Sequence, residues 1–305
     1  MISQSGALGF AMAQAIERGS SFSHVLTAGN SADVDVADQV AYLAEDPGCK
    51  VIACIFEGMA NPERFIEAAE IAWSVDKPLV VYKIATGEQG AAAAMSHTGS
   101  LAGSNAAYRA AFERAGVIVV DNCEALLETA AFFAKAPRPT AQGVAVIATS
   151  GGASIMAADK AEAHGIALPQ PSDPVRAVLE AHIPEFGSAR NPCDVTAQVL
   201  TNPQSISACG DALMSDAAYG AVIIPQVYAY DAATPRIKTF NDLAIKHGKM
   251  TCNVWITEWL EGPGAREAEC SPRMALFRSM DRCFATIAAW HRRDARRIKP
   301  PRVMR

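Results

Sequence analysis

A single histidine, His97, lies in a segment almost free of charged and bulky side chains, AAAAMSHTGSLAGSN (91–105). The segment follows a predicted strand that ends at Lys83-Ile84 and precedes a predicted helix that begins at Ser104-Asn105. In a parallel α/β sheet this place is the carboxyl edge, where ligands bind. An imidazole in a glycine-containing loop at that edge is a candidate nucleophile. The competing interpretation is a histidine that serves packing alone.

A carboxylate beside a nucleophilic imidazole keeps one ring nitrogen protonated, so that the other presents its lone pair. Glu57 is the candidate for this task, because it directly follows the apolar run VIACIF and precedes Gly58. This position also lies at the carboxyl edge of the predicted sheet. A glutamate that caps a helix or faces solvent is the alternative.

Two further turns could bind an anion. Ser3-Gln4-Ser5-Gly6 and Thr149-Ser150-Gly151-Gly152 each combine hydroxyl groups with free backbone N–H groups at a predicted helix start. The unpaired amides and the helix dipole favour negative charge there. Neither turn matches a P-loop, a dinucleotide fingerprint or a nucleophile elbow. Tight packing of helix on strand is the alternative for each turn, and their matched positions favour the anion site.

Alternating apolar strands and helical periods position these residues. The predicted strands are 24–28, 50–57, 78–84, 117–120, 143–149, 221–227 and 252–257. The predicted helices include 7–18, 36–45, 61–76, 106–116, 123–136 and 279–296. Such alternation is typical of a doubly wound α/β fold with parallel sheets. A Pro-rich stretch at 136–143 predicts a linker, and hence domains at 1–137 and 143–298.

The two halves of the chain resemble each other. SGALGFAMAQAIERG (5–19) aligns without a gap with GGASIMAADKAEAHG (151–165). We therefore expect two related domains that each open with a strand, a glycine turn and a helix. Only Met1-Ile2 precede the first turn, so the first strand is expected to be truncated and the chain to be part of a larger protein or an unusual subunit.

Composition excludes several classes of function. The net charge of −5 gives no reason to expect nucleic-acid binding. The eight cysteines form no pair or cluster with metal-ligand spacing, so no metal site is expected within the chain and the thiols should be reduced. No signal peptide or bilayer-spanning run is present, and the sequence predicts a soluble, cytoplasmic protein without a membrane partner.

Several of these motifs resemble the NDP-forming acyl-CoA synthetases of the succinyl-CoA synthetase superfamily. They are ISQSGALG, GNSADVD (29–35), FEG with NPERFIEAA, and above all SHTGSLAGS. TSGGAS and NPCDVT (191–196) resemble the next domain of the same family, with Cys193 where an aliphatic residue is expected. We therefore expect two flavodoxin-like three-layer domains with parallel sheets, of which the first carries the phosphohistidine.

The resemblance implies a reaction and its residues. Members form an acyl-CoA reversibly from a carboxylic acid, CoA and ATP, through an acyl phosphate and a phosphohistidine. His97 would be phosphorylated, Glu57 would orient it, and Ser5-Gly6 and Ser150-Gly151-Gly152 would bind the phosphoryl group. Arg190, just before NPCDVT, is a weaker candidate for pairing with a substrate carboxylate or phosphate; a surface arginine is the alternative.

The resemblance also indicates what lies elsewhere. The family's N-terminal CoA-binding domain and the ATP-grasp module for nucleotide and Mg²⁺ are not found in this sequence. We therefore expect an ATP-grasp partner subunit or fused domains, within a homo- or hetero-oligomer. The alternative is a catalytically incomplete paralogue that serves as a regulatory or scaffolding subunit. The acyl substrate and the choice between ATP and GTP cannot be derived from the sequence.

Overall fold

The chain divides into two compact units in the computed structural model. One contains Met1–Ala134 and the other Lys135–Arg297. Residues 1–31, 33–98, 104–231 and 233–298 are described, those at 97, 98 and 233 by backbone alone. The finer domain boundaries drawn from the sequence, 1–137 and 143–298, stay a prediction.

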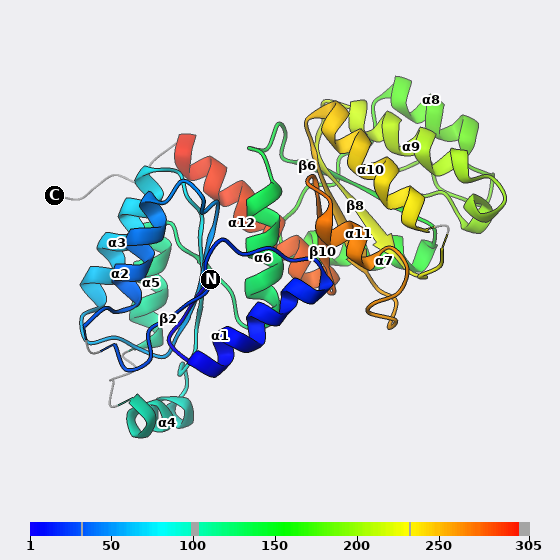
Figure 1. Ribbon diagram of the computed structural model, residues 1–305. Coiled ribbons are helices and arrows are strands. Elements are labelled where there is room, and N and C mark those ends of the chain that lie inside the picture. The colour runs from blue at the N-terminus through cyan, green and yellow to red at the C-terminus, as the bar shows by residue number, and fades with distance from the viewer. Residues whose placement is uncertain (32, 99–103, 232, 299–305) are drawn as a thin grey trace. The chain divides into compact units, whose positions relative to one another are not determined.

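The first unit is built on a five-stranded parallel sheet with the strand order β2-β1-β3-β4-β5. The strands are β1 (Ile2–Ser3), β2 (Leu26–Thr27), β3 (Ile52–Phe56), β4 (Leu79–Lys83) and β5 (Ile118–Val119). The helical segments are α1 (Gly6–Ala13), the 3₁₀ helix η1 (Gln14–Arg18), α2 (Val36–Glu45), α3 (Pro62–Ser74), α4 (Glu88–Thr98), α5 (Asn105–Ala115) and α6 (Cys123–Lys135). Helices α2, α3 and α5 cover one face of this sheet (Figure 1).

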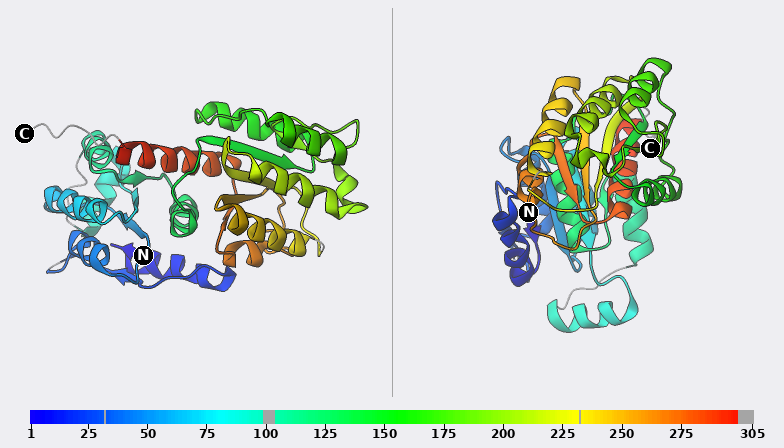
Figure 2. Two further views of the ribbon diagram at one scale, coloured as in Figure 1. Left: turned by 90° about the horizontal axis from the view of Figure 1, so that it is seen from above. Right: turned by 90° about the vertical axis from the view of Figure 1, so that its right-hand side faces the viewer.

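The second unit repeats this architecture with the strand order β10-β9-β8-β6-β7. The strands are β6 (Gly143–Ala148), β7 (Cys193–Asp194), β8 (Tyr219–Gln226), β9 (Met250–Trp255) and β10 (Met274–Phe277). The helical segments are α7 (Gly151–Ala163), α8 (Asp173–His182), η2 (Ala197–Leu200), α9 (Pro203–Ser215), α10 (Ala233–His247), α11 (Ala265–Cys270) and α12 (Met280–Ile298). Helices α8, α9 and α10 lie together on one face of the sheet (Figures 1 and 2).

Both sheets have the same order when each is numbered from its own first strand, 2-1-3-4-5. This is the flavodoxin-like order, in which the chain reverses direction across the sheet beside the first strand. The expected fold class of two flavodoxin-like three-layer domains is therefore confirmed. The switch points, where ligands bind in such folds, lie between β1 and β3 and between β6 and β8.

Continuous apolar strands supply both cores. In the first unit, buried residues of β1 and β3 pack against α2, α3 and α5, with an aromatic cluster formed by Phe56, Phe65, Tyr108 and Phe112. In the second unit, β6 and β8 pack against α8, α9 and α10. Strands buried on both faces read as near-continuous apolar runs, which is why these elements were predictable.

Three expectations about local structure need correction. His97 does not lie in a loop, because its backbone belongs to the last turn of α4; the alanine run that precedes it has the highest intrinsic helix propensity. The first helix does not continue to residue 18, since it changes to the 3₁₀ form at Gln14. The helix starts place Gly6 opposite Gly151, one residue away from the gapless sequence alignment.

All eight cysteines are free, and those at 49, 54, 193, 209, 252 and 283 are buried. Burial raises the pKa of the Cys54 and Cys193 thiols, so these groups stay protonated and unreactive. Within the part of the chain that the structure describes, no helix has both the length and the apolar character needed to cross a membrane.

Candidate functional site

Gln4 joins the two loops that flank the switch point of the first sheet. Its side-chain Oε1 accepts hydrogen bonds from the backbone N–H groups of Glu57, at 2.7 Å, and Gly58, at 3.3 Å. Its Nε2 donates to the carbonyl oxygen of Gly58 at 3.0 Å. The turn after β1 and the loop after β3 are therefore held together by one buried amide, which the sequence did not single out.

Glu57 lies at the carboxyl end of β3, as the sequence predicted. The residue is 8% exposed, so a solvated glutamate is not the correct description. Its backbone is fixed on two sides, by Gln4 and by the ammonium of Lys83, which donates to the Glu57 carbonyl oxygen at 2.9 Å. The structure thus provides a rigid support for a carboxylate at the switch point.

Lys83 is a second residue that the sequence analysis missed. It ends β4, is 5% exposed, and its Nζ also donates to the Ile84 carbonyl oxygen at 2.9 Å. The Nζ lies 4.9 Å from the centre of the Tyr108 ring, a favourable cation–π distance. Burial lowers the pKa of Lys83. A lysine at the end of the apolar run PLVVYKI was the signal available in the sequence.

The turn at the start of α1 is open above its first residue. Ser5 is the N-cap, and its Oγ accepts a hydrogen bond from the Leu8 N–H at 3.4 Å. A Cβ atom placed on Gly6 would meet nothing within 4 Å, whereas one placed on Gly9 would lie 2.9 Å from Cγ2 of Thr27. Packing thus explains Gly9 but not Gly6. The space above Gly6 and the unpaired N–H groups of the first helical turn suit an anion.

His97 belongs to α4, which extends away from the helices that cover the sheet (Figures 1 and 2). Only its backbone is described, so its relation to Glu57 stays a prediction. The rest of SHTGSLAGS, from Gly99 to Gly103, lies outside the described residues.

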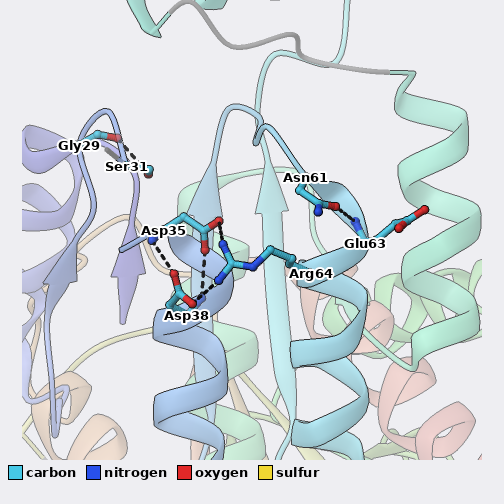
Figure 3. Close-up of polar contacts among 7 residues, drawn as sticks. All are labelled: Gly29, Ser31, Asp35, Asp38, Asn61, Glu63 and Arg64. Atoms are coloured by element: carbon cyan, nitrogen blue, oxygen red, sulfur yellow. Dashed lines mark hydrogen bonds and ion pairs between the residues drawn. The ribbon is translucent and has the colours of Figure 1, made fainter. Parts of the chain in front are cut away.

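A neighbouring cluster has a structural role (Figure 3). Asp35 and Asp38 form a capping box at the start of α2, and the guanidinium of Arg64 binds both carboxylates from α3. Asn61 caps α3 by accepting from the Glu63 N–H at 3.1 Å. The Asp35 backbone N–H, with help from Arg64, lowers the pKa of Asp38. GNSADVD and NPER therefore fix two helix starts at the carboxyl edge.

The matching turn of the second unit is occupied by a carboxylate. Ser150 is the N-cap of α7 but makes no side-chain capping bond. A Cβ atom on Gly151 would lie 3.2 Å from Oδ2 of Asp194. The other oxygen of Asp194 accepts from the Thr196 N–H at 2.9 Å, which fixes the carboxylate beside the helix start. Asp194 belongs to the motif NPCDVT, and nothing in the sequence alone assigned it a role.

Arg190 is exposed, and its backbone N–H donates to Oγ of Ser188 at 3.3 Å. The next residue, Asn191, accepts from the Val146 N–H at 2.9 Å, in the middle of β6. Gly152 follows the far end of that strand. Asp194, which pairs with Ala148 at that end, is therefore better placed near the turn than Arg190, whose role stays a prediction.

No group of three His, Cys, Asp or Glu side chains suited to a metal ion occurs among the described residues. The site offers an open helix start, a buried glutamate at a strand end and a histidine-bearing helix. These parts suit transfer of a phosphoryl group, in which positioning and electrostatic stabilisation do most of the work.

Comparison with known proteins identifies proteins that this chain resembles. Residues 1–133 match the family described as succinyl-CoA ligase like flavodoxin domain. The chain is 39% identical over 197 residues to the alpha subunit of acetate–CoA ligase (ADP-forming) I of Pyrococcus furiosus, which is 64% of this chain and 42% of that subunit. For subunit alpha of the second enzyme of that organism the identity is 37%, over 43% of its length.

A solved structure extends the similarity to both units. It is the acetyl-coenzyme A synthetase 1 of Ca. Korarchaeum cryptofilum in complex with phosphate and ADP, with a TM-score of 0.81 and 27% identity. The match covers 98% of this chain and 65% of that one. Of the two curated alpha subunits, by contrast, the chain spans less than half of the length. Residues 1–133 are thus similar to the succinyl-CoA ligase like flavodoxin domain, and the chain is similar to parts of ADP-forming acetate–CoA ligases.

Proposed function

We propose that this chain is the phosphohistidine-bearing part of an NDP-forming acyl-CoA synthetase. The observation that carries the proposal is the switch point of the first sheet, where the open turn at Gly6 and the buried Glu57 are held together by Gln4. The alpha subunits and the ADP- and phosphate-bound synthetase that the chain resembles support it.

His97 would accept the phosphoryl group. A ring nitrogen attacks the γ-phosphorus of ATP, and ADP leaves. The carboxylate substrate then takes the phosphoryl group, which gives an acyl phosphate and restores the imidazole. Attack by the CoA sulfur on the acyl carbon releases phosphate and yields acyl-CoA. Every phosphoryl oxygen carries charge through these steps, so oriented amide donors lower the barrier.

Glu57 would orient the His97 ring and offset the positive charge that develops on it. The N–H groups after Ser5 and Gly6 would hold the phosphoryl group. Ser150, Gly151 and Gly152 are proposed as a second phosphate-binding turn. Its affinity should be lower, because the carboxylate of Asp194 already occupies the positive end of that helix.

Nucleotide, Mg²⁺ and CoA would be bound mainly by other modules, either an ATP-grasp partner subunit or domains fused to this chain. The proposed assembly is a homo- or hetero-oligomer that acts in the cytoplasm. Eight free cysteines support a reducing compartment.

The test is phosphorylation of the full chain by γ-labelled ATP in the presence of Mg²⁺ and an ATP-grasp subunit of the ADP-forming type. We expect label that is acid-labile and alkali-stable on His97, and its loss in His97→Ala. Glu57→Gln should keep the fold and slow labelling by about 10²-fold or more, since one preorganised electrostatic partner is removed.

His182→Ala is the matched control, because His182 is an exposed histidine of the second unit whose Nδ1 lies 2.9 Å from the Val178 carbonyl oxygen of its own helix. It should label at the wild-type rate. Full labelling of His97→Ala would refute the assignment. The scaffolding alternative would be favoured if wild type took up no label from an ATP-grasp subunit that does phosphorylate the subunit with which it naturally pairs.

A further inference from the structure

The second unit contains a cavity that the proposed transfer chemistry does not use. Its volume is about 250 Å³, and it lies where η2 leads into α9 and where α10 begins. Helices α9 and α10 pack side by side over the sheet (Figure 1). Both begin at the carboxyl edge, which is the ligand-binding edge of a parallel α/β sheet.

Most of the cavity wall is apolar. Val199 and Leu200 come from η2, and Pro203 and Pro235 from the starts of the two helices. Leu200 is 64% exposed although it lines the cavity, so an apolar side chain is left in contact with water. A ligand with an apolar body would cover that surface favourably.

One cation, Arg236, lines the cavity. Its Nη2 donates to the Tyr230 hydroxyl at 2.6 Å, and its guanidinium carbon lies 5.7 Å from the centre of that ring. One donor is thus used and the guanidinium is oriented, while four N–H groups stay available for a ligand.

Arg236 differs from the other basic residues of α10. Lys238 pairs with Asp242 at 2.6 Å, and Lys246 pairs with Asp211 at 2.8 Å. Asp211 also binds His247. Within the described ranges of the chain, no carboxylate forms an ion pair with Arg236. Among the basic side chains of α10, Arg236 is therefore the one whose positive charge can pair with a bound anion.

We propose that this cavity binds a small monocarboxylate with an apolar body. A planar guanidinium matches the two oxygens of a carboxylate. A single positive charge suits a single negative charge, and Gln204 brings the positive end of the α9 dipole to the same cavity. The volume is below the range of about 300–1,000 Å³ for drug-sized ligands, so the occupant is small. The proposal does not depend on the phosphohistidine mechanism.

The test is calorimetric titration of the full chain with benzoate and with its neutral analogue benzamide. We expect saturable 1:1 binding of benzoate and binding of benzamide that is at least about tenfold weaker, since charged hydrogen bonds contribute about 1.5–3 kcal/mol. Arg236→Gln should weaken benzoate binding by a similar factor, because it keeps a donor for Tyr230 without the charge.

Lys238→Gln is the matched control on the same helix and should bind benzoate as wild type does, since Lys238 is 77% exposed and is engaged by Asp242. Ser207→Leu should abolish binding by filling the cavity while leaving Arg236 in place. Equal binding of acid and amide, or unchanged affinity for benzoate in Arg236→Gln, would overturn the proposal. Circular dichroism of each variant separates loss of the site from loss of the fold.

Discussion

The glycine turns before α1 and α7 occupy the same place in two sheets of the same strand order, yet they differ in charge. The space above Gly6 is empty to 4 Å, whereas the matching Gly151 faces a carboxylate oxygen of Asp194 at 3.2 Å from its virtual Cβ. Both helices lack acidic residues in their first turn. In the second unit the neighbouring strand β7 supplies the negative charge instead.

A helix start can serve as an anion site only where no other negative group already lies beside it. The Asp194 carboxylate lies beside the first residue of α7, where a negative charge is favourable for the helix dipole. The first turn is left without such a group and lies beside the Gln4-bridged loops. We therefore expect the first turn to bind phosphate better than the second.

The largest expected effect concerns the glycine that packing requires. In Gly9→Leu the new side chain would clash with Thr27 and Ser3 beneath α1, and we expect a loss of about 2–3 kcal/mol in the free energy of unfolding. Urea-induced unfolding measures it. Gly6→Ala, at the open position, should stay within about 0.5 kcal/mol of wild type. A loss below about 1 kcal/mol in Gly9→Leu would mean that packing does not explain this glycine.

A smaller effect is expected at the buried lysine of the first edge. Lys83→Met leaves the carbonyl oxygens of Glu57 and Ile84 without their donor, which should cost about 1–2 kcal/mol. Because burial lowers the pKa of Lys83 in the folded protein, the unfolded chain binds more protons between that pKa and its ordinary value of about 10.4. Wild type should therefore gain stability over the variant as the pH rises through this interval.

Unfolding of both proteins in urea at neutral and alkaline pH measures this difference. If the difference in unfolding free energy between wild type and Lys83→Met became smaller as the pH rises, burial would not be lowering the pKa of Lys83.

The smallest effect is expected at the second turn. Asp194→Asn removes the charge beside α7 and keeps an oxygen for the Thr196 N–H, so we expect a loss of about 0.5–1 kcal/mol. Unfolding measured at low and high salt should show the loss shrinking as salt screens the charge. A variant more stable than wild type at low salt would show that Asp194 does not satisfy this helix start.

The sequence predicts the edge of the site better than its details. The carboxyl-edge position of Glu57 follows from the apolar run before it, because a strand buried on both faces is easily recognised. The bridge made by Gln4 cannot be read from the sequence, because its partners Glu57 and Gly58 lie more than 50 positions further along the chain. Strand β7 has two residues, too few for any period to appear. It carries Asp194, so the sequence could not distinguish the two turns.

For His97 the sequence made a wrong prediction, because the glycines and small residues around it favoured a loop. The local propensity of the alanine run decided its conformation up to Thr98. The sequence thus predicted which strand each candidate residue follows. The conformation of the segment between β4 and α5 was harder to predict, because its alanines favour a helix whereas its glycines favour a loop.

The most direct test of the account is binding of inorganic phosphate to the full chain at low ionic strength, measured by calorimetry for wild type, Gly6→Val and Gly152→Val. The Val side chain at Gly6 would fill the open space of the first turn, and Gly152 is a nearly open glycine of the second turn. The account predicts that Gly6→Val weakens the tighter phosphate binding about tenfold or more, while Gly152→Val, in the turn proposed to bind phosphate more weakly, leaves that tighter binding unchanged. Retained binding in Gly6→Val, or its loss in Gly152→Val alone, would contradict the assignment of the first turn as the phosphoryl site.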